Sequence, residues 1–394
     1  MLYCLLAYIR YATSSCSTLC QSLELAQQHT RIHRGQAFTS CKMTTHNAPS
    51  LLLALPQDVQ QRLLAGCRYE DLFSLSAVCR AFRSAVNDPK FTTVRQSHGF
   101  VERGVVLLGT RRYNAVDIRS AQTRSIKVSI TAERLELDSG DTTTDGRRLF
   151  VGCNGGSLGP HQTIIYALDV ISRQWSRFAP LPHNRGLHCM EWYAGRLYVA
   201  GGFSTQTTHE VRTSFCVYNE ATRSWDDLPP MPVGCWCGSS GVIGDLLLIA
   251  GGSGQVANRK LQIFDFTTGQ WRLGPPLPAR GEDTPGVVSE DKLFVPVGFG
   301  PGDRIMLIYD PQSDAWTQER IPGPFYQKFV CACAHYGSIF VFLEGGAAYE
   351  RAPDGSWSAY TCTHAHARDA LKAPADFNGI VGWGNTRVES ILLG

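Results

Sequence analysis

The sequence has little excess charge of either sign and no long hydrophobic run. Its 37 Lys and Arg stand against 34 Asp and Glu, which leaves a formal net charge of +3 over 394 residues. Nucleic-acid binding needs a strongly basic surface that neutralises phosphates, so no nucleic acid is expected as a partner. The longest apolar stretch covers residues 1–9. It is about half as long as a membrane-spanning helix, so no membrane span is expected either.

Cysteine is also too sparse for a disulfide scaffold, with 14 residues in the chain and no C-x-x-C pair. This usage predicts a reducing compartment, the cytoplasm, the nucleus or both. Cys235 and Cys237, and likewise Cys331 and Cys333, are two residues apart on predicted strands, where each pair could bind a soft metal. No histidine converges on them, so we interpret them as small buried residues. We predict no metal, no cofactor and no catalytic residue.

Residues 1–48 lack the patterning of a domain, because Ser, Thr and Cys are scattered there without helical or strand periodicity. We interpret this segment as a disordered extension or a mispredicted start ahead of Met43. An organelle transit peptide is the alternative, since such peptides are rich in Ser and poor in acidic residues.

Turn-forming residues and large aromatics are abundant, with 38 Gly, 20 Pro and 8 Trp. They indicate many short strands joined by tight turns. A short apolar strand phrase recurs, usually ending in Gly, at residues 149–152, 197–202, 247–252, 293–298 and 339–342. Each phrase is followed by a late Trp, at Trp175, Trp225, Trp271, Trp316 and Trp357, 41 to 50 residues apart. A proline-rich run follows each of the first four Trp residues and would stop the outer strand.

Residues 49–92 differ from this pattern, because their apolar residues return at helical spacing. Pro56 suits a first helical turn, and Val59 with Leu63 begins a row one turn apart. The pattern predicts a module of about three short helices. So small a module buries little surface alone, so we expect it to complete its core against a partner.

This module resembles an F-box, through Leu55-Pro56, Asp58-Val59 and the later Leu, Val-Cys-Arg and Phe positions. The resemblance implies docking to the Skp-type adaptor of a cullin-RING ubiquitin ligase. The adaptor-binding residues it implies are Leu55, Pro56, Val59, Leu63, Leu72, Leu75, Val78, Cys79 and Phe82.

The repeats resemble kelch repeats, in which each repeat forms one four-stranded blade. The predicted fold is therefore mainly β: a six-bladed kelch β-propeller over residues 104–394, joined by a linker, residues 93–103, to the helical F-box module. The first blade is short of one strand, so we expect the C-terminal strand to complete it and close the propeller.

The informative polar residues fall in loops expected on one face of the propeller. Several Arg or Lys around a channel mouth would favour an acidic or phosphorylated protein segment. The predicted substrate-binding residues are Arg185, His209, Arg259, Arg280, Arg304, Tyr326 and Lys328.

The resemblances together imply a non-catalytic substrate receptor of an SCF-type ubiquitin ligase, whose propeller binds the protein to be ubiquitinated and degraded by the proteasome. One alternative is a propeller enzyme or a metal-dependent small-molecule protein, which bound metal would support. Another is a kelch scaffold without an attached ligase.

Overall fold

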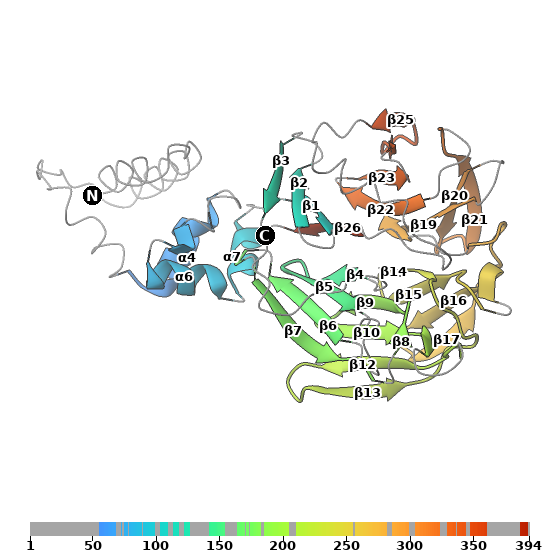
Figure 1. Cartoon of the computed structure of the whole chain (residues 1–394), viewed down its shortest axis with the longest axis horizontal. Coiled ribbons are helices and arrows are strands. Elements are labelled where there is room, and N and C mark those ends of the chain that lie inside the picture. Colours follow the sequence, from blue (N-terminus) through green and yellow to red (C-terminus); the bar gives the residue numbers. More distant parts are fainter. Residues whose placement is uncertain are drawn as a thin grey trace, which may run out of the picture. The chain divides into compact units, whose positions relative to one another are not determined.

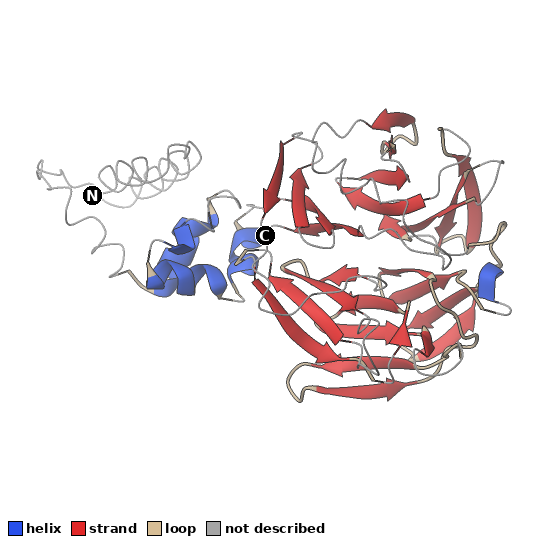
Figure 2. Cartoon of the chain, in the orientation of Figure 1, coloured by secondary structure: helices blue, strands red, loops and turns tan. Residues whose placement is uncertain are grey.

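The computed structural model describes the chain in segments (Figure 1). They are residues 55–67, 72, 75–77, 79–88, 90–98, 103–108, 113–117, 122–126, 142–153, 164–169, 171–172, 174–182, 185–204, 210–254, 257–281, 286–298, 304–323, 329–335, 337–343, 347–360 and 387–392. They form two compact units, a helical unit in the residues up to 102 and a β unit of Arg103–Val170 and Gln174–Ile391 (Figure 2). The predicted extension, residues 1–48, lies outside the described residues.

The described helices of the helical unit are α4 (Gln57–Ala65), α6 (Arg80–Asn87) and α7 (Phe91–Ser97). Pro56 precedes α4 with a φ of −54°, and its missing N–H costs nothing at a helix start. Cys79 caps α6, because its Sγ accepts a hydrogen bond from the backbone N–H of Phe82 at 3.4 Å. Helix α4 packs against both α6 and α7. The predicted short helical module is therefore present.

The interior of this unit combines apolar side chains with one buried cation. The apolar residues, each at most 8% exposed, are Leu64, Ala65, Leu72, Leu75, Phe82, Ala85, Val86 and Phe91. Arg95 on α7 is also buried, and its Nη1 donates to the carbonyls of Ala65 at 2.9 Å and Cys67 at 2.5 Å. Carbonyls at the end of a helix lack partners within that helix, and Arg95 supplies one for α4. Helix α7 thereby extends the helical unit to Ser97, into the segment predicted as a linker.

Five four-stranded antiparallel sheets of the β unit each use strands that follow one another along the chain. The first comprises β4 (Thr142–Thr144), β5 (Arg148–Cys153), β6 (Ile164–Asp169) and β7 (Gln174–Pro180), and the second β9 (Cys189–Tyr193), β10 (Arg196–Ala200), β12 (Phe215–Asn219) and β13 (Ser224–Leu228). The third comprises β14 (Ser239–Ile243), β15 (Leu246–Ala250), β16 (Leu261–Asp265) and β17 (Gln270–Leu273), and the fourth β18 (Val287–Ser289), β19 (Lys292–Val297), β20 (Ile305–Asp310) and β21 (Ala315–Arg320). The fifth comprises β22 (Phe329–His335), β23 (Ser338–Leu343), β24 (Ala348–Arg351) and β25 (Trp357–Tyr360).

A further four-stranded sheet draws on both ends of the β unit. Its order is β26 (Arg387–Leu392), β1 (Arg103–Leu108), β2 (Tyr113–Asp117) and β3 (Gln122–Ile126). Two further short strands pair with each other. They are β8 (Arg185–Gly186), just before the second sheet, and β11 (Phe203–Ser204), in the connection between β10 and β12. The coarse prediction of a mainly β propeller behind a helical module is confirmed.

The repeat phrases occupy equivalent places in these sheets. Each apolar phrase forms the second strand of its sheet, and each late Trp lies on the fourth. In three sheets the Trp lies opposite an aromatic residue on the third strand, in the pairs Tyr218 with Trp225, Phe264 with Trp271, and Tyr309 with Trp316. These rings approach to centroid distances of 5.1 to 5.2 Å, which adds aromatic contact to the strand pairing.

Neighbouring sheets pack face to face and share apolar cores. Their first strands contact one another in the order β4, β9, β14, β18 and β22. One cluster joins Leu248 and Ile263 of the third sheet to Leu293 and Leu307 of the fourth. Gly251, just after β15, has a φ of +66°, and a Cβ there would lie 2.1 Å from the carbonyl oxygen of Gly281. Glycine is required at that position, as the recurring Gly predicted.

Candidate functional site

The helical unit presents a partly exposed apolar row at the start of α4. Val59 and Leu63 are half-buried and lie one turn apart on the helix, and Leu55 precedes them at the same spacing. Gln60 holds the entering chain, because its Nε2 donates to the Leu55 carbonyl at 2.9 Å. Pro56 is exposed beside this row. We call Leu55, Pro56, Val59 and Leu63 the α4 row.

Three other predicted adaptor-binding residues are part of the interior instead. Leu72, Leu75 and Phe82 are 0%, 4% and 8% exposed. They contribute to the core of the helical unit, which so small a unit needs, and their role as adaptor contacts stays a prediction. Cys79 is half-buried and caps α6. The side chain of Val78 lies outside the described residues.

Two of the predicted substrate-binding cations are buried. Arg185 on β8 is 0% exposed, and its Nη1 donates to the carbonyls of Gly201 at 3.2 Å and Ser214 at 3.3 Å. Arg304 is 4% exposed just before β20. Arg185 lies between the last strand of the first sheet and the first strand of the second in the sequence, and its guanidinium contacts backbone carbonyls. Both arginines are buried, and their role in substrate binding stays a prediction.

The structure brings two other predicted cations together on the surface. Arg259 ends the 3-10 helix η1 (Ala257–Arg259), in the connection between β15 and β16, and Arg280 follows β17. Backbone hydrogen bonds join these segments, because the Leu277 N–H donates to the Arg259 carbonyl at 3.1 Å. The Arg259 Nη2 also donates to the Pro278 carbonyl. Both arginines are exposed. His209, Tyr326 and Lys328 lie outside the described residues.

Sequence reasoning missed a buried histidine near Arg185. His188 is 3% exposed, and neither of its ring nitrogens has a hydrogen-bond partner. Burial, and then the positive charge of Arg185, lower the pKa of His188 to about 3. The ring is therefore neutral at physiological pH. A single histidine outside any recognisable motif carried no signal that could have identified it.

Of the paired cysteines, Cys235 and Cys237 are buried, and burial raises the pKa of Cys235 to about 12. A protonated thiol is a poor nucleophile. The side chain of Cys331 lies outside the described residues. No group of three or more His, Cys, Asp or Glu in the described part of the chain could hold a metal ion. None of the described helices is long and apolar enough to cross a membrane.

Comparison with known families matches both units. The F-box domain model matches residues 52–93, and the Kelch motif model matches residues 192–232. The first match covers α4, α6 and the start of α7, and the second covers the second sheet from β9 to β13.

Three proteins with similar sequences are described as F-box/kelch-repeat or Kelch-like proteins. An F-box/kelch-repeat protein of Arabidopsis thaliana is 26% identical over 234 residues, which cover 56% of this chain and 61% of that protein. Kelch-like protein terF of Aspergillus terreus is 26% identical over 208 residues, covering 48% and 44%. Kelch-like protein 36 of Bos taurus is 26% identical over 183 residues, covering 44% and 29%. The chain thus spans less than two thirds of each of these relatives. One segment matches the F-box domain model and another the Kelch motif model, and the fold is a mainly β propeller with a short helical region before it in the sequence.

Proposed function

We propose that this protein is a non-catalytic substrate-recognition subunit of an SCF-type ubiquitin ligase. The α4 row docks a Skp-type adaptor and, through it, the cullin-RING ligase. The propeller binds the protein that is ubiquitinated and degraded. The observation that carries this proposal is the α4 row itself, an apolar surface left partly exposed by a unit that matches the F-box model.

The adaptor interaction is tested by co-purification. Leu55→Ala combined with Pro56→Ala should reduce adaptor recovery by orders of magnitude, because each large apolar anchor contributes about 2–4 kcal/mol to a well-packed contact. Arg62→Ala is the matched control, since Arg62 is an exposed residue of the same helix. Wild-type recovery by the double variant would contradict adaptor docking through this row.

The number of blades and the closure of the propeller are also part of this proposal. We count the sheet β26-β1-β2-β3 as the sixth blade, in which the C-terminal strand supplies the first position. Strand β1 contacts β22 of the fifth sheet, which is the neighbour that closure requires. Pairing the two ends of the β unit removes an open sheet edge. Deleting residues 387–394 should therefore lower the melting temperature of the whole β unit.

Substrate capture is assigned to the exposed pair Arg259 and Arg280, with His209, Tyr326 and Lys328 as further predicted contacts. Two cations on adjoining segments favour an acidic or phosphorylated segment. Arg259→Ala combined with Arg280→Ala should reduce substrate recovery in an affinity-purification mass-spectrometry comparison, while adaptor recovery stays unchanged. If the wild-type protein and the double variant recover the same substrates, Arg259 and Arg280 do not contribute to substrate binding.

Two outcomes separate this proposal from its alternatives. A kelch scaffold without a ligase would yield no adaptor with the wild-type chain. A metal-dependent enzyme would yield stoichiometric metal by elemental analysis of the purified protein. Placement in the cytoplasm or nucleus is part of the proposal, and its support is the sparse cysteine content without a C-x-x-C pair.

A further inference from the structure

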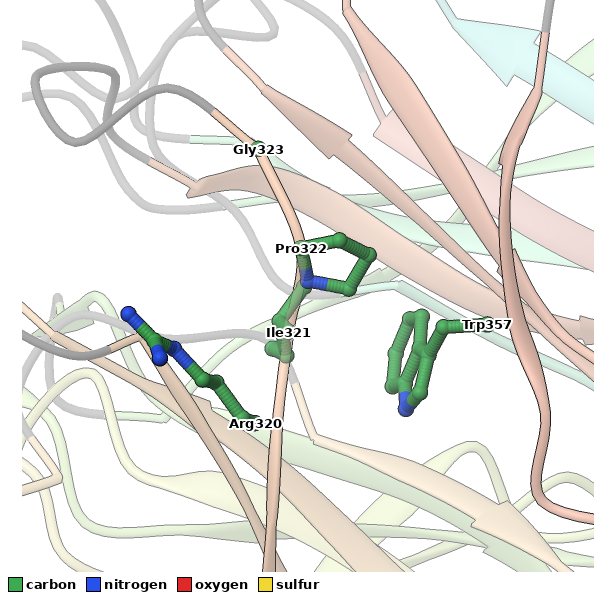
Figure 3. Close-up of a pocket in the computed structure, with 5 residues that line it drawn as sticks. All are labelled: Arg320, Ile321, Pro322, Gly323 and Trp357. Atoms are coloured by element: carbon green, nitrogen blue, oxygen red, sulfur yellow. The ribbon is translucent and has the colours of Figure 1, made fainter.

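A pocket of about 380 Å³ lies between the segment that follows β21 and the first residue of β25. Its lining comprises Arg320, Ile321, Pro322, Gly323 and Trp357 (Figure 3). In that view the Pro322 ring points toward the indole of Trp357. Ile321 forms a buried floor, whereas Arg320 and Gly323 are exposed, so the pocket opens to solvent.

The chain itself shows what occupies the equivalent place between other blades. The indole Nε1 of Trp225 donates to the carbonyl of Pro180 at 2.7 Å, that of Trp271 to Pro229 at 2.8 Å, and that of Trp316 to Pro275 at 3.0 Å. In each case the acceptor belongs to the proline-rich run of the preceding blade. Three blade junctions are therefore closed by contact between a Trp and a proline-bearing segment.

The junction at Trp357 differs. Its Nε1 donates to the carboxylate of Glu319, at 3.2 Å from Oε2, and to no proline carbonyl. Arg351 already holds this carboxylate with two contacts of 2.7 Å, from Nε and Nη2. The hydrogen bonds from Arg351 hold the pKa of Glu319 below its usual value, so the carboxylate stays ionised and compensated.

The difference follows from the length of the segment before Ile321. Met231, Leu277 and Ile321 are equivalent, because each backbone N–H donates to a carbonyl just before the third strand of its sheet. Between the repeat Trp and this buried position the other blades have residues 176–180, 226–230 and 272–276, each ending in proline. The fourth blade has only residues 317–320, with no proline. One residue and its proline ring are missing, and the pocket lies where they would pack.

The backbone conformation beside the pocket also prevents a side chain of the same chain from filling it at that position. Gly323 has a φ of +122°, and a Cβ there would lie 2.4 Å from the hydroxyl of Tyr349. Only glycine fits against the Tyr349 ring, so no side chain at this position covers the pocket.

We propose that this pocket binds a proline of an extended partner segment. The proline packs between Trp357 and Pro322, where aromatic side chains favour the stiff, low-entropy polyproline conformation. The Arg320 side chain points away from Pro322 and Trp357 (Figure 3), so the apolar contact carries the binding. This site is independent of the α4 row, so it can hold even if adaptor docking fails.

The probe is a fluorescein-labelled oligoproline peptide, titrated with the full-length protein by fluorescence anisotropy. The comparison peptide has alanine in place of every proline. The proline peptide should bind, and the alanine peptide should bind at least about tenfold more weakly. Equal binding of the two peptides, or binding of neither, overturns the proposal.

Two variants test the pocket directly. Inserting one proline between Arg320 and Ile321 restores the length of the other blades and should abolish binding without loss of fold. Trp357→Ala should weaken binding by about tenfold or more. The matched control is Trp271→Ala, which removes an equivalent Trp already bonded to Pro229. Each variant is compared by thermal melting, and retained binding by a folded insertion variant overturns the site.

Discussion

The helical unit and the β unit differ in how completely they bury their apolar side chains. The helical unit has a small core around Leu72 and Phe82 and leaves the α4 row partly exposed. The β unit buries its apolar residues between neighbouring sheets, and Leu273 is the one large apolar side chain classed as exposed among all described residues. A short helical module has too little volume to cover its own surface, whereas stacked sheets cover one another. The first unit thus leaves an apolar surface partly exposed, and the second has a pocket lined by Trp357 and Pro322.

Each of the two units also contains a buried arginine that donates hydrogen bonds to backbone carbonyls. Arg95 donates to the carbonyls of Ala65 and Cys67 where α4 ends, and Arg185 donates to those of Gly201 and Ser214 between sheets. The Ser214 carbonyl also accepts a hydrogen bond from the Gly201 N–H at 3.0 Å, so Arg185 is its second donor. A long, permanently charged donor can reach several such carbonyls at once.

The interior of the helical unit should be its most sensitive part. Leu72→Ala should lower the free energy of unfolding by about 2–5 kcal/mol, because Leu72 is fully buried. That loss is comparable with the whole stability of so small a unit. Leu63→Ser on the α4 row should cost less than about 1 kcal/mol, yet should reduce adaptor binding. Circular dichroism melting and co-purification measure the two effects, and a Leu63→Ser protein as unstable as Leu72→Ala would contradict the division into core and surface.

The β unit should be most sensitive where its sheets converge. Gly251→Ala should destabilise by about 2–5 kcal/mol, because a Cβ there meets the Gly281 carbonyl and the backbone has positive φ. Gly269→Ala is the matched control: its φ of +69° is similar, but no atom lies within 4 Å of the added Cβ. Only the conformational cost of about 1–2 kcal/mol should remain there. Urea unfolding of both variants measures the difference, and equal losses would refute the close approach of blades.

Buried His188 should make the β unit sensitive to acid. Its pKa is about 3 when folded, against 6.5 for an exposed histidine, so between these values the unfolded chain binds a proton that the folded chain does not. Stability should therefore fall as pH drops from 6.5, by about 1.4 kcal/mol per pH unit, and be unaffected above it. Denaturant unfolding between pH 7 and 5 measures the slope. His188→Leu should remove this part of it, and an unchanged slope would contradict the burial of a neutral ring.

The exposed arginines should matter least for stability. Arg280→Ala should change the free energy of unfolding by less than about 0.5 kcal/mol, because its guanidinium is at the surface. Thermal melting measures this, with substrate recovery followed in parallel. A large loss of stability would instead give Arg280 the bracing role that Arg185 has.

The regular features of the fold could be predicted from the sequence, because they repeat. Five strand phrases and five Trp residues marked the second and fourth strands of five sheets, and helical spacing marked the small module. The sites were less predictable. Arg185 and Arg280 stand in similar sequence surroundings, after a proline-rich run, yet one is buried and the other exposed. Periodicity gives a residue's place on a strand or loop, but not the direction in which a long, flexible side chain turns.

The order of a helical module and a repeated β architecture follows from local patterns, because periodic burial and turn chemistry act within short segments. Which side chains are available depends on the folded structure. Arg95, Arg185 and His188 are buried by segments distant in the sequence, and Arg259 meets the Pro278 segment through contacts between connections. The pocket at Trp357 likewise arises from one missing residue at a blade junction. Whether the missing residue leaves a pocket depends on how the neighbouring blade packs, and no local sequence pattern indicates that packing.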